Sequence, residues 1–140
     1  MNAADFMRKA ASSLRAARLL FDNGFMDDAS SRAYYAMFDA ARAALLAADA
    51  PVESEIARTH KGLIASFGKH IVKPGMVAPE VGRSLGQAQH VRLIADYNGD
   101  PIDARDAARM LLWATNFVGV VSERFQLSKD FEPPRYGGPR

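Results

Sequence analysis

Apolar side chains recur every three or four residues along most of this chain, and strict alternation of apolar and polar residues is scarce. A spacing of three or four places apolar residues on one face of a helix, whereas a half-buried strand would need a period of two. The pattern predicts helices over residues 5–23, 27–48, 53–71, 78 to 95 or 97, and a long one that begins after the cap Asp103. The predicted fold class is therefore all-α.

Turn and cap residues separate these predicted helices. Gly24 stops the first one, Asp27 is suited to cap the second, and Pro79 is placed like a first-turn helical proline. The last ten residues, 131–140, are rich in Pro and Gly. We therefore expect one helical domain over residues 1–130, followed by a flexible tail over 131–140.

Composition narrows the class of protein further. A chain of 140 residues with 49% apolar content can fill one core. It has no cysteine, no signal-peptide pattern and no apolar run long enough to span a membrane, so a cytoplasmic protein without membrane contact is expected. A net charge of +2 is compatible with an RNA or phosphate partner. Metal-binding and phosphate-cradling motifs are missing, so neither a metal centre nor a cofactor is predicted.

The second predicted helix combines a packing face with a polar ridge. The packing face consists of Tyr34, Phe38, Ala41 and Leu45. The polar ridge consists of Arg32, Tyr35, Asp39 and Arg42. On such a ridge an arginine can bind an RNA phosphate and a tyrosine can stack on a base. Alternatively, Arg32 extends along the surface and the tyrosines simply pack with satisfied hydroxyl groups.

A second polar group is predicted near the end of the fourth helix. Arg92 and Asp96 lie one helical turn apart, so they can pair and orient the guanidinium toward a phosphate. Tyr97 follows directly. If the second and fourth helices are antiparallel neighbours, this group and the polar ridge share one cleft. The alternative is an ordinary exposed ion pair, worth about 0.3–0.5 kcal/mol.

His60 is the third candidate, because it lies close to the apolar stripe of the third predicted helix. An unperturbed imidazole titrates near neutral pH, so His60 is suited to act as a general base or to hydrogen-bond across the cleft. A structural histidine at the edge of the core is the competing interpretation.

Motifs spread over residues 5–125 resemble the HEPN superfamily. These motifs are Gly24-Phe25, Arg32-Ala-Tyr-Tyr-Ala-Met-Phe38, His60, Phe67 and Arg92-x-x-Ala95-Asp96-Tyr97. The most similar branch consists of small prokaryotic HEPN proteins. The resemblance implies an antiparallel bundle of four or five helices and a homodimer. Small residues that permit close helix approach between subunits are Ala40, Ala44, Gly82 and Gly86.

The resemblance also implies a function. HEPN proteins are often RNA-cleaving toxins, and many are encoded beside a minimal nucleotidyltransferase that acts as antitoxin. Their catalytic signature is an arginine, four to six residues, then a histidine. Arg92 fits the arginine of this signature. With four intervening residues the histidine position is occupied by Tyr97, and with six it is occupied by Gly99. Tyrosine has an ordinary pKa of about 10 and is a poor general base near pH 7.

We therefore expect a toxin-like or substrate-binding member of a two-gene system with a nucleotidyltransferase, which binds RNA or a nucleotide between the second and fourth helices. The alternatives are an active ribonuclease and a stand-alone helical interaction module. Candidate catalytic residues are Arg92, Asp96, Tyr97 and His60. Candidate substrate-binding residues are Arg32, Tyr35 and Asp39.

Overall fold

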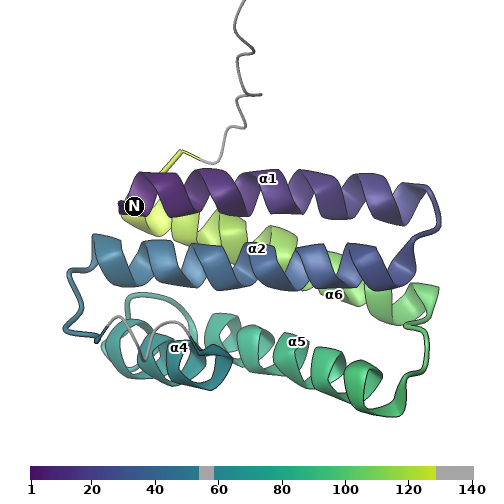
Figure 1. Ribbon diagram of the computed structural model, residues 1–140. Coiled ribbons are helices and arrows are strands. Elements are labelled where there is room, and N and C mark those ends of the chain that lie inside the picture. The colour runs from purple at the N-terminus through teal and green to yellow at the C-terminus, as the bar shows by residue number, and fades with distance from the viewer. Residues whose placement is uncertain (54–58, 129–140) are drawn as a thin grey trace, which may run out of the picture.

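A computed structural model describes residues 1–53 and 59–128, and this part of the chain is helical and contains no strand. Four long helices run alternately up and down: α1 (Ala3–Asp22), α2 (Met26–Ala47), α5 (Pro79–Asn98) and α6 (Ala104–Phe125) (Figure 1). The short α4 (His60–Phe67) and the π-helical turn η1 (Gly68–Val72) pack against α2 and α5. The predicted all-α antiparallel bundle is confirmed. The predicted tail, 131–140, lies outside the described residues.

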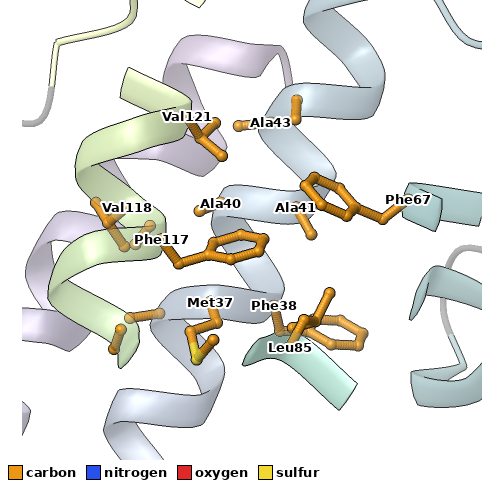
Figure 2. Close-up of a cluster of buried hydrophobic side chains, with 14 of the residues drawn as sticks. Met37, Phe38, Ala40, Ala41, Ala43, Phe67, Leu85, Phe117, Val118 and Val121 are labelled. Atoms are coloured by element: carbon orange, nitrogen blue, oxygen red, sulfur yellow. The ribbon is translucent and has the colours of Figure 1, made fainter. Parts of the chain in front are cut away.

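The core is built around α2, which contacts every other helix of the bundle. Its buried side chains include many alanines, and these leave room for larger groups from the neighbouring helices. In Figure 2 the rings of Phe67 and Phe117 lie over this alanine surface, with their centroids 5.1 Å apart. Ala40 and Ala44 are fully buried within one subunit. The prediction that they form a face between subunits is therefore wrong, because the α2 alanines are already covered by the chain's own helices.

The helix ends follow local chemistry, with some corrections. α1 begins two residues earlier than predicted, because the side chain of Asn2 caps it by accepting from the backbone N–H of Asp5. Asp103 caps α6 as predicted. Asp27 does not cap α2. Its carboxylate instead accepts from the backbone N–H of Ile102 at 2.7 Å, which ties the start of α2 to the segment before α6.

The third predicted helix differs from the observed one at both ends. Its predicted start at residue 53 is wrong, because 51–53 have no helical structure and α4 begins at His60. Residues 54–58 lie outside the described part. Thr59 defines the start, since its hydroxyl accepts from the backbone N–H of Gly62. The helix then widens into η1, where the N–H of Lys73 donates to the carbonyl oxygen of Gly68 at 2.9 Å.

Two glycines of α5 have different surroundings. A Cβ atom on Gly82 would lie 2.7 Å from Cγ2 of Val72, so glycine is what allows η1 to approach α5 this closely. A Cβ atom on Gly86 would meet nothing within 4 Å. The close approach predicted for Gly82 therefore occurs within the subunit, and it fixes the α4 and η1 layer on the bundle.

Candidate functional site

His60 forms the centre of an aromatic cluster that joins α4 to α2. The hydroxyl oxygen of Tyr34 lies 2.7 Å from Nδ1 of His60. The two rings are nearly parallel, with an angle of 16° and a centroid distance of 5.4 Å. The ring of Phe38 lies 4.9 Å from that of His60. Although His60 is itself an exposed residue, one edge of its imidazole is therefore held against the core.

The two tyrosines of this cluster have different environments. Tyr34 is 3% exposed, and burial, with a smaller contribution from Tyr35, raises the pKa of its phenol to about 12. Tyr35 is 43% exposed, and its ring meets the His60 ring edge-on at 6.1 Å. Tyr34 is therefore a protonated buried hydroxyl group over the whole physiological pH range. Tyr35 has a ring surface that a ligand can reach.

The predicted polar ridge of α2 is not continuous. Arg32 and Tyr35 are exposed, but Asp39 is buried, so its expected place on an exposed ridge is wrong. Burial raises the pKa of the Asp39 carboxyl, while Lys9 and Arg42 act in the opposite direction. The guanidinium of Arg42 lies 4.7 Å from the ring centroid of Phe38. The physical reason is the central position of α2, because α1 covers the side of the helix that carries Asp39.

Arg92 and Asp96 form the predicted pair on α5. A guanidinium nitrogen of Arg92 lies 3.0 Å from a carboxylate oxygen of Asp96. The Arg92 side chain is 21% exposed and that of Asp96 is 64% exposed, so the arginine is the better-held partner. Tyr97 is 91% exposed. The three residues therefore occur together at the surface, with the tyrosine open to solvent.

Exposed apolar side chains accompany this pair on the last two turns of α5. Leu93 is 57% exposed and Ile94 is 47% exposed. They contribute to a surface hollow of about 710 Å³. Its lining residues are His90, Leu93, Ile94, Asp96, Tyr97 and Asn98. This end of α5 thus combines a charged pair, an exposed tyrosine and an apolar surface.

The two groups lie at a similar height on adjacent, antiparallel helices. Phe38 and Leu85 are drawn next to each other in Figure 2, both belong to the buried core, and α2 contacts α5. Arg32 lies six residues before Phe38 on α2, and Arg92 lies seven residues after Leu85 on α5. Because the two helices are antiparallel, both steps lead toward the same end of the bundle, and each covers roughly 10 Å at 1.5 Å per residue. Within residues 1–53 and 59–128, however, no hydrogen bond, ion pair or ring contact joins these two arginines. The hollow on α5 is not lined by Arg32, Tyr35 or Asp39.

Two features of this surface were not predicted from the sequence. Tyr34 was assigned to packing alone, although a buried tyrosine usually needs a hydrogen-bond partner, and its partner His60 belongs to a different helix. The exposed apolar residues Leu93 and Ile94 were not among the candidate residues. Their exposure could not be read from periodicity, because α5 has apolar residues on more than one side.

Comparison with known proteins agrees with this architecture. The HEPN domain family matches residues 3–124, which include all the helices of the bundle except the last residue of α6. The chain belongs to the HEPN family. The HEPN match includes the aromatic cluster around His60 and the Arg92 and Asp96 pair.

Several relatives of this HEPN protein cover most of its length. A UPF0332 protein of Gloeobacter violaceus is 36% identical over 121 residues, which are 85% of this chain and 92% of the relative. "Putative toxin MJ0605" of Methanocaldococcus jannaschii is 34% identical over 114 residues, or 81% of each chain. "Putative toxin MJ0142" of the same organism is 27% identical over 124 residues, which are 89% of this chain and 81% of the relative.

Two further observations concern metal binding and membrane-spanning helices. Among the described residues, no group of three His, Cys, Asp or Glu side chains is placed to hold a metal ion. No helix in that same part of the chain is long and apolar enough to cross a membrane.

Proposed function

We propose that this HEPN protein is the toxin-like, RNA-binding member of a pair with a nucleotidyltransferase, and that it binds RNA on the surface shared by α2, α4 and α5. The observation that supports this most directly is the Arg92 and Asp96 pair within a HEPN domain. A guanidinium that is held by a carboxylate and still partly exposed is suited to contact a phosphate. The names of two relatives fit a toxin-type system.

The remaining parts of the surface have complementary roles in this proposal. Arg32 adds a second exposed cation at about the height of Arg92. Tyr35 has an exposed ring on which a base can stack, and such stacking tolerates any base because every base has a π-face. Asp39 is buried and has no place in this ligand surface.

Binding without efficient cleavage is the expected activity. Tyr97 occupies the position of the family's catalytic histidine, and it is 91% exposed. Tyrosine in general keeps its proton near pH 7, because the ordinary pKa of a phenol is about 10, and it is therefore a poor general base there. An active ribonuclease would therefore need another group, and His60 is the candidate that the sequence offers.

The proposal is tested with the purified protein and a fluorescent single-stranded RNA in the presence of EDTA. We expect saturable binding that weakens as salt is added, because phosphate contacts release counterions. We also expect weak or no RNA cleavage. Failure to bind RNA at low salt would contradict the proposal. Robust cleavage that is lost in both Arg92→Ala and Tyr97→Phe would establish the ribonuclease alternative instead.

The partner and the oligomeric state belong to the same proposal. With Ala40 and Ala44 buried, the apolar end of α5 is the surface that we propose for the homodimer. A gene for a minimal nucleotidyltransferase next to this one, and co-purification of the two products, would support the paired system. A monomeric protein whose neighbouring genes serve an unrelated pathway would favour the stand-alone interaction module.

A further inference from the structure

The hydrogen bond between Tyr34 and His60 determines which nitrogen of the imidazole carries the proton. Neutral histidine has one ring nitrogen that donates and one that accepts. The Tyr34 hydroxyl can either donate to Nδ1 of His60 or accept from it, and the distance of 2.7 Å is compatible with both. The surroundings of Tyr34 decide between the two arrangements.

Among the described residues, His60 is the one hydrogen-bond acceptor for the Tyr34 proton. The residue is 3% exposed, and in the described part of the chain its hydroxyl has no hydrogen-bond partner besides His60. If Nδ1 carried a proton and donated it, the phenolic proton would have no acceptor among the described residues in this part-buried contact, which is unfavourable. The raised pKa of Tyr34 excludes the alternative of an ionised phenolate at neutral pH. The phenol must therefore donate.

We propose that Tyr34 is a positioning residue that holds His60 with its proton on Nε2, so that His60 offers RNA a hydrogen-bond donor and not a general base. This inference rests on the proposed function only for the identity of the ligand. Nδ1, the basic nitrogen of this tautomer, is occupied by Tyr34. Nε2 has no hydrogen-bond partner among the described residues. A donor beside the exposed ring of Tyr35 suits an acceptor oxygen of RNA, either on a phosphate or on a base.

The tautomer is measured directly by long-range 1H–15N correlation spectroscopy on the 15N-labelled protein at a pH where the histidines are neutral. The chain has three histidines, and the signals that disappear in His60→Gln assign the one of interest. We expect a protonated Nε2 and a hydrogen-bonded, unprotonated Nδ1. In Tyr34→Phe the two tautomers should mix. Tyr35→Phe is the matched control, because it removes a neighbouring hydroxyl and should leave the signals of His60 unchanged.

RNA binding provides the second measurement. His60→Ala should bind RNA about fivefold more weakly, as expected for the loss of one hydrogen bond. His60→Gln should retain most of the affinity, because its amide can donate from about the position of Nε2. An abasic oligonucleotide identifies the acceptor. If His60 contacts a phosphate, His60→Ala should also bind this oligonucleotide more weakly than wild type does. If His60 contacts a base, the two proteins should bind it equally.

These results separate this inference from the proposed function. If Nδ1 of His60 carries the proton in the wild type, Tyr34 does not hold the proton on Nε2. The same conclusion follows if the Nε2 tautomer is unchanged in Tyr34→Phe. Equal RNA affinity of wild type and His60→Ala would overturn the donor role. If the wild-type protein binds no RNA, the proposed function and the donor role toward RNA both fail, and the spectra still decide whether Tyr34 sets the tautomer.

Discussion

At the scale of single residues, two arginines on α5 form similar ion pairs in different surroundings. Arg83 pairs with Glu80 at 2.9 Å, and its side chain is 62% exposed. Arg92 pairs with Asp96 at 3.0 Å but is only 21% exposed. In both pairs the carboxylate is open to solvent, at 72% for Glu80 and 64% for Asp96, and ion pairs with a solvated partner contribute little to folding. The difference between the two arginines should therefore appear in ligand binding and not in stability.

Arg92→Ala is expected to fold normally and to lose function. Its free energy of unfolding should change by about 0.5 kcal/mol or less, whereas its affinity for RNA should fall about tenfold, as for the loss of a charged hydrogen bond. Urea denaturation and fluorescence titration measure the two quantities. Arg83→Ala is the matched control, and it should keep both. If Arg92→Ala is unstable but its folded fraction binds RNA normally, Arg92 is a structural residue.

The buried carboxyl of Asp39 predicts an unusual dependence of stability on pH. Because burial raises its pKa in the folded state, the folded protein holds the Asp39 proton more tightly than the unfolded chain does. This contribution to stability is complete below the ordinary aspartate pKa of 3.8 and is lost as pH rises through the raised folded pKa. Asp39→Asn should abolish this loss and be more stable than wild type at pH 7.

Urea denaturation of Asp39→Asn and wild type across this pH range checks the prediction. The difference between the two proteins should grow from acid toward neutral pH and then stay constant. A variant that is less stable than wild type at pH 7 would mean that the attraction of Lys9 and Arg42 outweighs the cost of burial.

At the scale of the elements, the packing of η1 against α5 depends on one glycine. Alanine is ordinarily the better helix residue by about 1 kcal/mol. At position 82 this gain is opposed by the contact of the new Cβ with Val72 at 2.7 Å. At position 86 nothing opposes it. Replacing glycine by alanine should therefore lower the stability at position 82 and raise it at position 86, one helical turn further on.

Gly82→Ala is expected to lower the free energy of unfolding by about 1–3 kcal/mol, as overpacking usually does. Gly86→Ala, its matched control, should raise that free energy by about 0.5–1 kcal/mol. Thermal denaturation followed by circular dichroism measures both. Equal stabilisation by the two substitutions would show that Val72 can move away at no cost, and that η1 is not held tightly on α5.

At the scale of the whole molecule, the described residues leave an apolar surface at the end of α5. Leu93, Ile94 and Tyr97 are exposed there, next to the Arg92 and Asp96 pair. A specific dimer interface usually buries about 1,200–2,000 Å² in total. A homodimer that uses this surface would place the arginines of two subunits near each other, and would thereby enlarge the positive surface offered to RNA.

Leu93→Asp is expected to convert the protein into a folded monomer, because a charge in an apolar interface loses its hydration without gaining a partner. Light scattering at tens of micromolar measures the oligomeric state. Leu112→Asp on α6 is the matched control, since Leu112 is 70% exposed but lies outside the α5 surface. A monomeric wild type would contradict the proposed dimer. If only Leu112→Asp dissociates the dimer, the interface lies on α6 and not on α5.

Much of the fold could be predicted from the sequence alone. The period of the apolar residues, the cap at Asp103 and the stop at Gly24 are local features, and each acts through the backbone within a few residues. They determined the helical class and most helix boundaries. The Arg92 and Asp96 pair was predictable for the same reason, because one helical turn brings its two side chains together.

Only the tertiary structure decided which of the candidate residues share an environment. Asp39 and Tyr35 lie one turn apart on α2, yet one is buried and the other is 43% exposed. Tyr34 and His60 are 26 residues apart in the chain, and their hydrogen bond exists because α4 packs on α2. Burial and long-range contacts depend on which helices cover a given face, and the local periodicity of one helix does not contain that information.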